Sequence, residues 1–271
     1  MNHGTAPILP SRVPWRIRAF GYLRRRGARR NFNRLKSLGV GGSLRRISEV
    51  IRSATELWLS DRFDDRLGAD TAGDLSIDEL TVPIEARHTA HGFRSIPAGC
   101  FRRAIRCLRL PLEDFVFVDV GCGKGRALLV AAEFPFRQLI GVEHAEDLVF
   151  IARRNLAAAR KVVRGMPAVE IVHRDAARFD VPDDPCVFFF YNPFSDELLR
   201  LVLAQLIASF AAKPRKLVLL FARQKSPEGR WAGLTSTETR VFHERMLPPL
   251  RSLWTHPRIE YFAFESHSAA T

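Results

Sequence analysis

The stretch Phe115-Val116-Phe117-Val118-Asp119-Val120-Gly121-Cys122-Gly123-Lys124-Gly125-Arg126 decides the fold of this chain. Its first half is a short, nearly unbroken apolar run, which is typical of a parallel strand buried on both faces. Three glycines at alternate positions follow. Glycines at the point where a strand turns into a helix let the backbone approach a ligand closely, beside the free N–H groups of the helix. The stretch therefore predicts a strand, a ligand-binding loop and a helix start, in that order.

Strand-like and helix-like segments alternate after this loop. The sequence predicts strands at 139–142, 169–172, 186–191 and 216–221, and helices at 145–160 and 196–210. A helix at 98–108 precedes the first strand, and 239–246 with 258–264 are expected to pair as an antiparallel hairpin. The alternation predicts right-handed β-α-β crossovers and an α/β, doubly wound, mostly parallel sheet.

Polar residues stand at the ends of the next three predicted strands. Glu143 ends the second strand, twenty residues after Gly123, where its carboxylate can accept from both hydroxyls of a ribose. Asp175 follows the third strand and can accept from an exocyclic adenine amine, and Asn192 follows the fourth. Open α/β sheets bind ligands at the carboxyl edge of their strands, so a nucleotide-like ligand is expected there. The glycine spacing alone also fits a nicotinamide dinucleotide fold, although the third glycine comes one residue early for it.

Over about residues 114–221 the sequence resembles the class I S-adenosylmethionine-dependent methyltransferases. The matching motifs are Asp119 to Gly125, Gly141-Val142-Glu143, Arg174-Asp175-Ala176 and Asn192-Pro193-Phe194. Asp70-Thr71, His91-Gly92-Phe93 and Phe134-Pro135-Phe136 resemble a widespread bacterial subgroup of that superfamily. The resemblance implies a seven-stranded sheet with an antiparallel last strand and S-adenosylmethionine as cofactor. It implies cofactor contacts from Asp119, Gly121, Cys122, Gly123, Gly125, Glu143, Asp175, Ala176 and Asn192.

The motif after the fourth strand points to the reaction. In the amine and amide N-methyltransferases that it resembles, Asp or Asn is followed by two prolines and Tyr or Phe. The side-chain oxygen and a proline carbonyl there orient the target nitrogen, and the ring packs on the acceptor. The resemblance thus implies catalytic roles for Asn192, Pro193 and Phe194, although this chain has one proline at the motif. A lysine-type amine, a planar amide and a base all remain open as acceptors, and so does the alternative that Asn-Pro merely turns the chain.

The excess positive charge sits at the N-terminus. Residues 1–60 hold thirteen Lys or Arg and two acids, a net +11, whereas 61–271 carry only +2. We therefore expect a basic arm and helix at 1–60, a linker at 61–79 and the methyltransferase domain at 80–271. The Arg-rich residues 12–52 suit a nucleic acid or an anionic membrane surface, a solvated tail without a partner, or an organellar transit peptide. A non-catalytic nucleic-acid or membrane-surface binding protein on the same fold is the alternative to an enzyme.

The remaining composition narrows the class of protein. The chain has 271 residues, 46% of them hydrophobic and 26% charged, and no apolar run of membrane-spanning length. Its four cysteines show no metal-ligand spacing, so neither a metal site nor a disulfide framework is expected, and a cytoplasmic location fits. Loop positions at His88, His91 and Arg94 are candidates for holding a substrate, with plain exposure as the alternative. Lys124 and Arg126 are expected near the glycine loop or in solvent, and Cys122 as a small packed residue.

Overall fold

The computed structural model describes residues 62–73, 75–81, 92–191, 195–224, 240–245, 247 and 259–267. The chain divides into two compact units, Met1–Arg66 and Leu67–Thr271, and the second contains the sheet. The basic arm and helix expected at 1–60 lie outside the described residues. Residues 67–79, assigned above to a linker, belong to the compact unit that holds the sheet.

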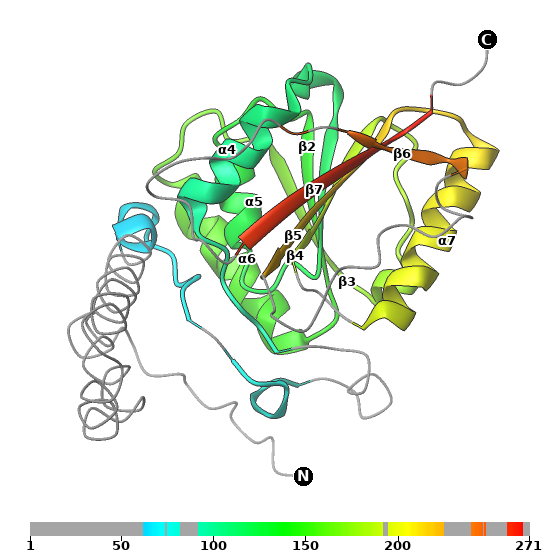
Figure 1. Cartoon of the computed structure of the whole chain (residues 1–271). Helices are drawn as coiled ribbons and strands as arrows, with labels where there is room; N and C mark the ends of the chain where they lie inside the picture. Colours follow the sequence, from blue (N-terminus) through cyan, green and yellow to red (C-terminus); the bar gives the residue numbers. More distant parts are fainter. Residues whose placement is uncertain are drawn as a thin grey trace, which may run out of the picture. The chain divides into compact units, whose positions relative to one another are not determined.

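The second unit is built on a seven-stranded mixed sheet with the order β3-β2-β1-β4-β5-β7-β6 (Figure 1). The strands β1 to β5 are parallel to one another, and β7 runs antiparallel to both β5 and β6. The predicted fold class, the expected antiparallel last strand and the terminal hairpin are all confirmed. The strands are β1 Val116–Val120, β2 Gln138–Glu143, β3 Ala168–His173, β4 Cys186–Tyr191, β5 Leu217–Gln224, β6 Phe242–Arg245 and β7 Ile259–Ser266.

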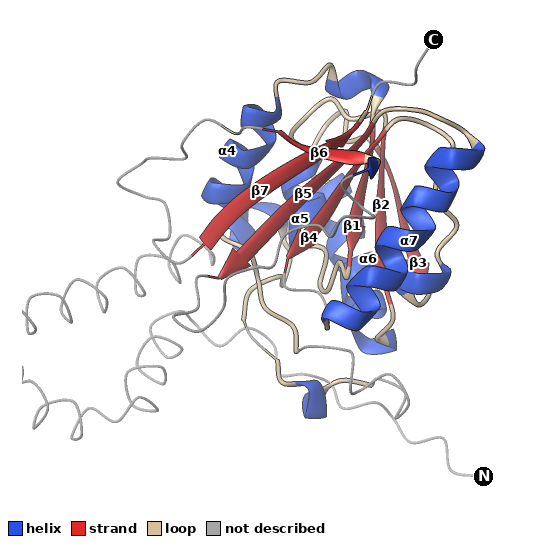
Figure 2. Cartoon of the chain, turned by 45° about the vertical axis from the view of Figure 1, so that its right-hand side comes forward, coloured by secondary structure: helices blue, strands red, loops and turns tan. Residues whose placement is uncertain are grey.

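Helices cover both faces of this sheet. The helices α4, α5 and α6 follow one another along one face, here called the α4 face, and α7 packs with η4 on the opposite face (Figures 1 and 2). The α-helices are α4 Ala98–Leu108, α5 Arg126–Ala131, α6 Glu146–Arg160 and α7 Asp196–Ala212, and the 3-10 helices are η1 Ile77–Glu79, η3 Leu112–Asp114 and η4 Ala176–Arg178.

The helices form where the sequence provides an apolar stripe at helical spacing or a capping side chain at the first turn. In α4, Phe101, Ala104, Ile105 and Leu108 recur at helical spacing and are all buried. The helix α7 begins at a side-chain cap, because the Ser195 hydroxyl accepts a hydrogen bond from the Leu198 N–H at 3.3 Å. Its buried residues Val202, Leu203 and Leu206 pack with the strands, so both helices lie with one stripe against the sheet.

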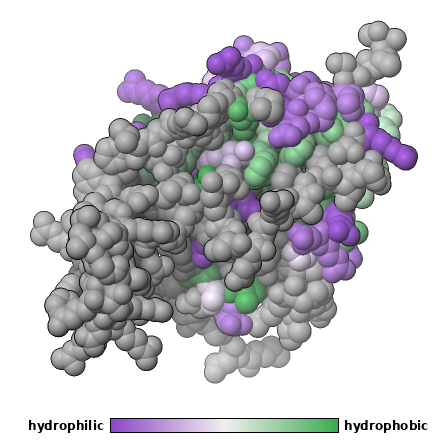
Figure 3. Space-filling view, in the orientation of Figure 1, coloured by the Kyte–Doolittle hydropathy of each residue, from purple (hydrophilic) through white to green (hydrophobic). Residues whose placement is uncertain are grey.

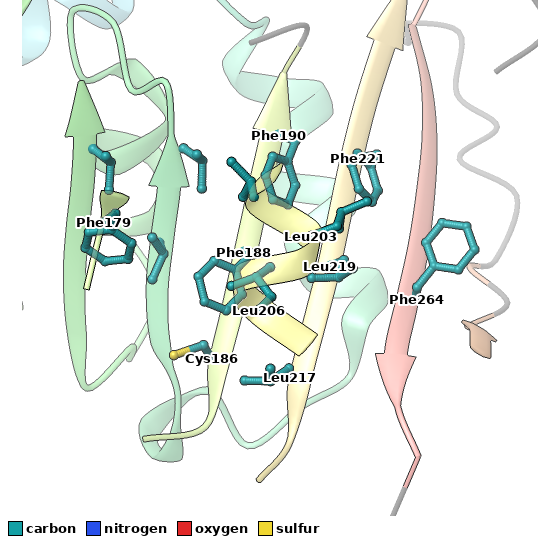
Figure 4. Close-up of a cluster of buried hydrophobic side chains, with 14 of the residues drawn as sticks. Phe179, Cys186, Phe188, Phe190, Leu203, Leu206, Leu217, Leu219, Phe221 and Phe264 are labelled. Atoms are coloured by element: carbon teal, nitrogen blue, oxygen red, sulfur yellow. The ribbon is translucent and has the colours of Figure 1, made fainter. Parts of the chain in front are cut away.

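The core extends over both faces of the sheet, because alternate residues of each strand point to opposite sides. On the α7 side, Leu203 and Leu206 of α7 lie over β4 and β5 (Figure 4), and the Phe190 and Phe221 rings stack with centroids 4.8 Å apart. On the α4 face, the Phe101 ring lies 4.2 Å from that of Phe189. This two-sided burial explains why the parallel strands read as continuous apolar runs in the sequence.

The described surface carries both hydrophilic and hydrophobic residues. In the view of Figure 3, hydrophilic residues lie around a smaller hydrophobic area on this face. Within the described part of the chain, no helix is both long enough and apolar enough to span a membrane.

Candidate functional site

The glycine loop lies where the strand order changes direction. From β1 the chain builds the sheet outward through β2 and β3, and then returns to place β4 on the other side of β1. In open α/β sheets such a switch point, at the carboxyl ends of the strands, is where ligands bind. The loop is fixed to β2, because the Gly121 and Cys122 N–H groups both donate to the Val142 carbonyl at 2.8 and 3.0 Å.

Glu143 ties the end of β2 to this loop. Its carboxylate accepts from the Gly123 N–H at 2.8 Å through Oε2, and from the His144 and Ala145 N–H groups at 2.8 and 2.9 Å through Oε1. Burial raises the pKa of Glu143, and these three N–H donors oppose that rise. A carboxylate offers about four accepting positions, so three main-chain donors leave about one for a ligand. A ligand that donates two hydroxyls to Glu143 must therefore exchange or share one of these bonds.

Asp119 is a second acid at the same edge, and it is buried. It lies at the end of β1, is 3% exposed, and shares the α4 face with Phe117 and Glu143. Burial, and secondarily the charge of Glu143, raise the pKa of Asp119 from 3.8 to about 8. At neutral pH the site thus favours a protonated Asp119 beside the glycine loop.

The glycine at 123 is required by a neighbouring side chain. Its φ is +55°, and a Cβ on it would lie 2.5 Å from Cδ2 of Phe93. A ligand is expected to make the close approach at this loop, whereas in the structure Phe93 makes it at Gly123. At Gly125, with φ +83°, the added Cβ would lie 3.5 Å from Ala152 of α6. The loop is therefore packed against protein at two of its glycines.

Both basic residues of the loop are buried. Lys124 is 6% exposed and donates to the Ala72 carbonyl at 3.2 Å, with the Asp70 carboxylate 3.7 Å away. Arg126 is 3% exposed, and its Nε donates to the Thr71 hydroxyl at 2.8 Å. The two side chains lie at the glycine loop, as expected, and the alternative that they are solvated is wrong, because the segment 70–72 folds back onto the loop and provides oxygen acceptors.

Asn155 of α6 completes this attachment. Its Nδ2 donates to the carbonyls of Asp70 and Lys124 at 3.0 and 2.9 Å, and its Oδ1 accepts from the Asp70 N–H at 2.9 Å. One amide thus joins segment 70–72, the glycine loop and α6. Sequence reasoning missed Asn155, and its only signal there is a polar residue on the buried side of an otherwise apolar helical stripe.

Cys122 behaves as a packed residue, as predicted. Its thiol is buried, and burial together with the charges of Asp119 and Glu143 raises the pKa of Cys122 well above its usual value. The thiolate needed for a nucleophile is therefore disfavoured. All four cysteines are free.

The loop after β3 lies beside the end of β2. The Arg174 N–H donates to the Glu143 carbonyl at 3.0 Å, which brings this loop next to the glycine loop. Asp175 caps η4 by accepting from the Ala177 N–H at 2.9 Å through Oδ1, and Ala176 packs against the core of the α7 face. The predicted adenine-side residues thus reach the same edge as Glu143.

The described part of the chain stops just before the motif that follows β4. Tyr191 ends β4 directly after Phe190, which pairs with Val120 of β1, and the three residues that follow, Asn192, Pro193 and Phe194, lie outside the described part of the chain. His88 and His91 lie outside it as well. Their assigned roles stay predictions.

The residues present fit an adenosine-bearing cofactor. The glycine loop, the half-buried Glu143 carboxylate and the Asp175-Ala176 turn lie along the carboxyl edge of β1, β2 and β3, where they offer N–H donors and carboxylate acceptors. Among the described residues, no group of three His, Cys, Asp or Glu side chains is arranged to hold a metal ion.

Comparisons with solved structures give methyltransferases at low identity. The 23S rRNA methyltransferase ErmE is 17% identical, over 64% of this chain and 69% of that one, with a TM-score of 0.42. A putative methylase from Haemophilus influenzae is 11% identical, over 72% and 99%, with a TM-score of 0.43. The magnesium protoporphyrin IX methyltransferase from Synechocystis PCC 6803, solved with bound SAM, is 16% identical, over 62% and 77%, with a TM-score of 0.39.

No family model and no curated protein matches the sequence. The three structures are too distant from this chain to say what it acts on. By its strand order and antiparallel last strand, the chain has the class I methyltransferase fold that the sequence resemblance implies.

Proposed function

We propose that the chain is an S-adenosylmethionine-dependent methyltransferase that acts on a nitrogen acceptor. The observation that carries this proposal is the Glu143 carboxylate, which is held at the end of β2 and bonded to the Gly123 N–H of the loop at the switch point. An acid in this place selects a ligand with ribose hydroxyls, and the absence of a phosphate-type Gly-x-Gly-x-x-Gly spacing argues against a dinucleotide.

The cofactor, when bound, supplies an electrophilic methyl group on a sulfonium. Glu143 would hold the ribose and Asp175 the adenine amine, and the glycine loop would lie under the amino-acid end. Asn192 and Pro193 would accept hydrogen bonds from the acceptor nitrogen and turn its lone pair toward the methyl carbon, while Phe194 packs on the acceptor. The acceptor nitrogen gains the carbon and loses a proton to solvent, so the chain's main contribution is orientation.

Two measurements test this proposal. Calorimetry with S-adenosylmethionine and its demethylated product should show binding of both by the full chain. Incubating a cell extract with methyl-labelled cofactor and sorting the label into protein, nucleic acid and small molecules then identifies the acceptor class. Absence of cofactor binding contradicts the proposal directly.

Asn192→Ala tests the nitrogen acceptor. Removing the oxygen that orients the nucleophile should lower the single-turnover rate at saturating cofactor roughly 100-fold. The control Phe194→Tyr keeps the aromatic ring and should keep the rate. If Asn192→Ala reacts at the wild-type rate, the motif is only a turn and the nitrogen-acceptor assignment is wrong.

The alternative is a non-catalytic binding protein, favoured by the net +11 of residues 1–60. Such a protein would bind polyanions in a salt-dependent way without turning over cofactor. Transfer of labelled methyl would exclude it.

The four free cysteines support a reducing compartment, and we place the protein in the cytoplasm.

A further inference from the structure

Three residues lie in register on three neighbouring strands of the sheet. The strands β4, β5 and β7 lie on the side of β1 away from Glu143, and Tyr191, Ala222 and Tyr261 stand opposite one another on them. Neighbouring strands are about 4.8 Å apart, so the two tyrosines are separated by roughly 10 Å of backbone with only an alanine between them. Two aromatic side chains therefore flank one small residue.

These three residues lie on the α4 face at the carboxyl edge. Phe189 contacts Phe101 of α4, and Tyr191, two residues later, is on the same face. Phe262 packs against the core of the α7 side, so Tyr261 points to the opposite, α4 face. Tyr191 is also the residue directly before Asn192, where methyl transfer is proposed.

The hydroxyl of Tyr261 is an unexplained polar atom. It is buried, and no described residue accepts from it or donates to it. Nearly all buried polar groups have a hydrogen-bond partner, and an unpaired hydroxyl reduces stability. Burial, with smaller effects of Cys100 and Tyr191, raises the pKa of Tyr261 well above its usual value, so the phenol stays protonated and can donate.

We propose that Tyr261 contacts the methyl acceptor through its hydroxyl, and that the acceptor is an uncharged planar group, an amide or a nitrogen heterocycle. This inference rests on the proposed methyltransferase function. Planarity follows from the aromatic residues on both sides of Ala222, because flat groups pack on aromatic rings. Neutrality follows from burial, because the Tyr261 hydroxyl lies in a buried position where a charged group would lose its hydration without gaining an opposite charge from this hydroxyl.

Tyrosine resonances provide a direct readout. The chain has three tyrosines, Tyr22, Tyr191 and Tyr261, so carbon-13 labelling at the tyrosine Cζ gives three signals that single Tyr→Phe variants assign. The full chain is first saturated with S-adenosylhomocysteine, so that planar probes do not enter the cofactor site. Adenine, cytosine, nicotinamide and, as the charged aliphatic control, n-butylamine are then titrated.

At least one planar probe should shift the signals of Tyr261 and Tyr191 while leaving that of Tyr22 in place, and butylamine should shift none of them. Tyr261→Phe should weaken the binding of that probe roughly tenfold, which is the effect of losing one hydrogen bond of ordinary strength. Because the hydroxyl has no described partner, Tyr261→Phe should not lower the urea midpoint.

Three results would overturn the inference. Either no planar probe shifts the Tyr261 signal, or butylamine shifts it more than the planar probes do, or Tyr261→Phe lowers the urea midpoint and leaves probe binding unchanged. Calorimetry with S-adenosylhomocysteine on the same sample keeps the two proposals apart. Failure of that binding counts against the methyltransferase function, and failure of the probes with binding intact counts only against the acceptor site.

Discussion

Replacing Asp119 by Asn should change how the stability of the protein depends on pH. In the folded chain the pKa of Asp119 is raised from 3.8 to about 8 by burial and by the charge of Glu143. In the unfolded chain both influences disappear, and the carboxyl titrates near its ordinary value of about 3.9. The Asn variant keeps the size and a polar amide but carries no proton to titrate.

The sign and size follow from proton linkage. Between about pH 4 and pH 8 the folded state binds more protons at Asp119 than the unfolded state does, so the free energy of unfolding falls as pH rises. A difference of about four pKa units at about 1.4 kcal/mol each gives an upper value of about 6 kcal/mol across that range. Below pH 4 and above pH 8 the contribution is constant. Asp119→Asn should therefore gain stability relative to the wild type as pH rises, by up to about 1.4 kcal/mol per pH unit.

Urea unfolding followed by circular dichroism, at intervals from pH 4.5 to pH 8.5, measures this difference. Groups that do not interact with Asp119 titrate equally in both proteins and cancel, which leaves Asp119 and its coupled neighbours Glu143 and Cys122. Phe117→Leu, on the same strand and face, controls for a general loss of stability and should follow the pH profile of the wild type. If the profiles of Asp119→Asn and the wild type run parallel over the whole range, the buried-acid reasoning is refuted.

Three other changes test separate features of the molecule. Glu143→Ala should weaken S-adenosylmethionine binding several-fold or more in calorimetry, because hydrogen bonds to a charged group contribute about 1.5–3 kcal/mol; an unchanged dissociation constant would contradict the ribose assignment. Asn155→Ala removes three hydrogen bonds and should lower the free energy of unfolding by about 3 kcal/mol in urea, whereas Phe150→Ala, on the exposed side of the same helix, should change it little. Deleting residues 1–40 should leave cofactor affinity intact and weaken binding to nucleic acid or anionic vesicles, most strongly at low salt; equal binding by both forms would make the arm a solvated tail.

The sequence by itself determined most of the secondary structure and the place of the loop. The runs at 186–191 and 98–108 give β4 and α4 with the predicted bounds, because a parallel strand buried on both faces and an amphipathic helix each leave a local pattern. The polar residues after the strands were found for the same reason, since the carboxyl ends of parallel strands meet at one edge. Glu143 and Asp175 both reach it.

Only the tertiary structure decided what surrounds the loop. The burial of Lys124 and Arg126 depends on Ala72 and Thr71, 52 and 55 residues away, and no local pattern reports such contacts. The same holds for Phe93 at Gly123, and for Tyr261, which the antiparallel register of β7 places opposite Ala222 and in line with Tyr191. Periodicity is a property of neighbouring residues, whereas burial, a raised pKa and an unpaired hydroxyl depend on which distant segments the fold brings together.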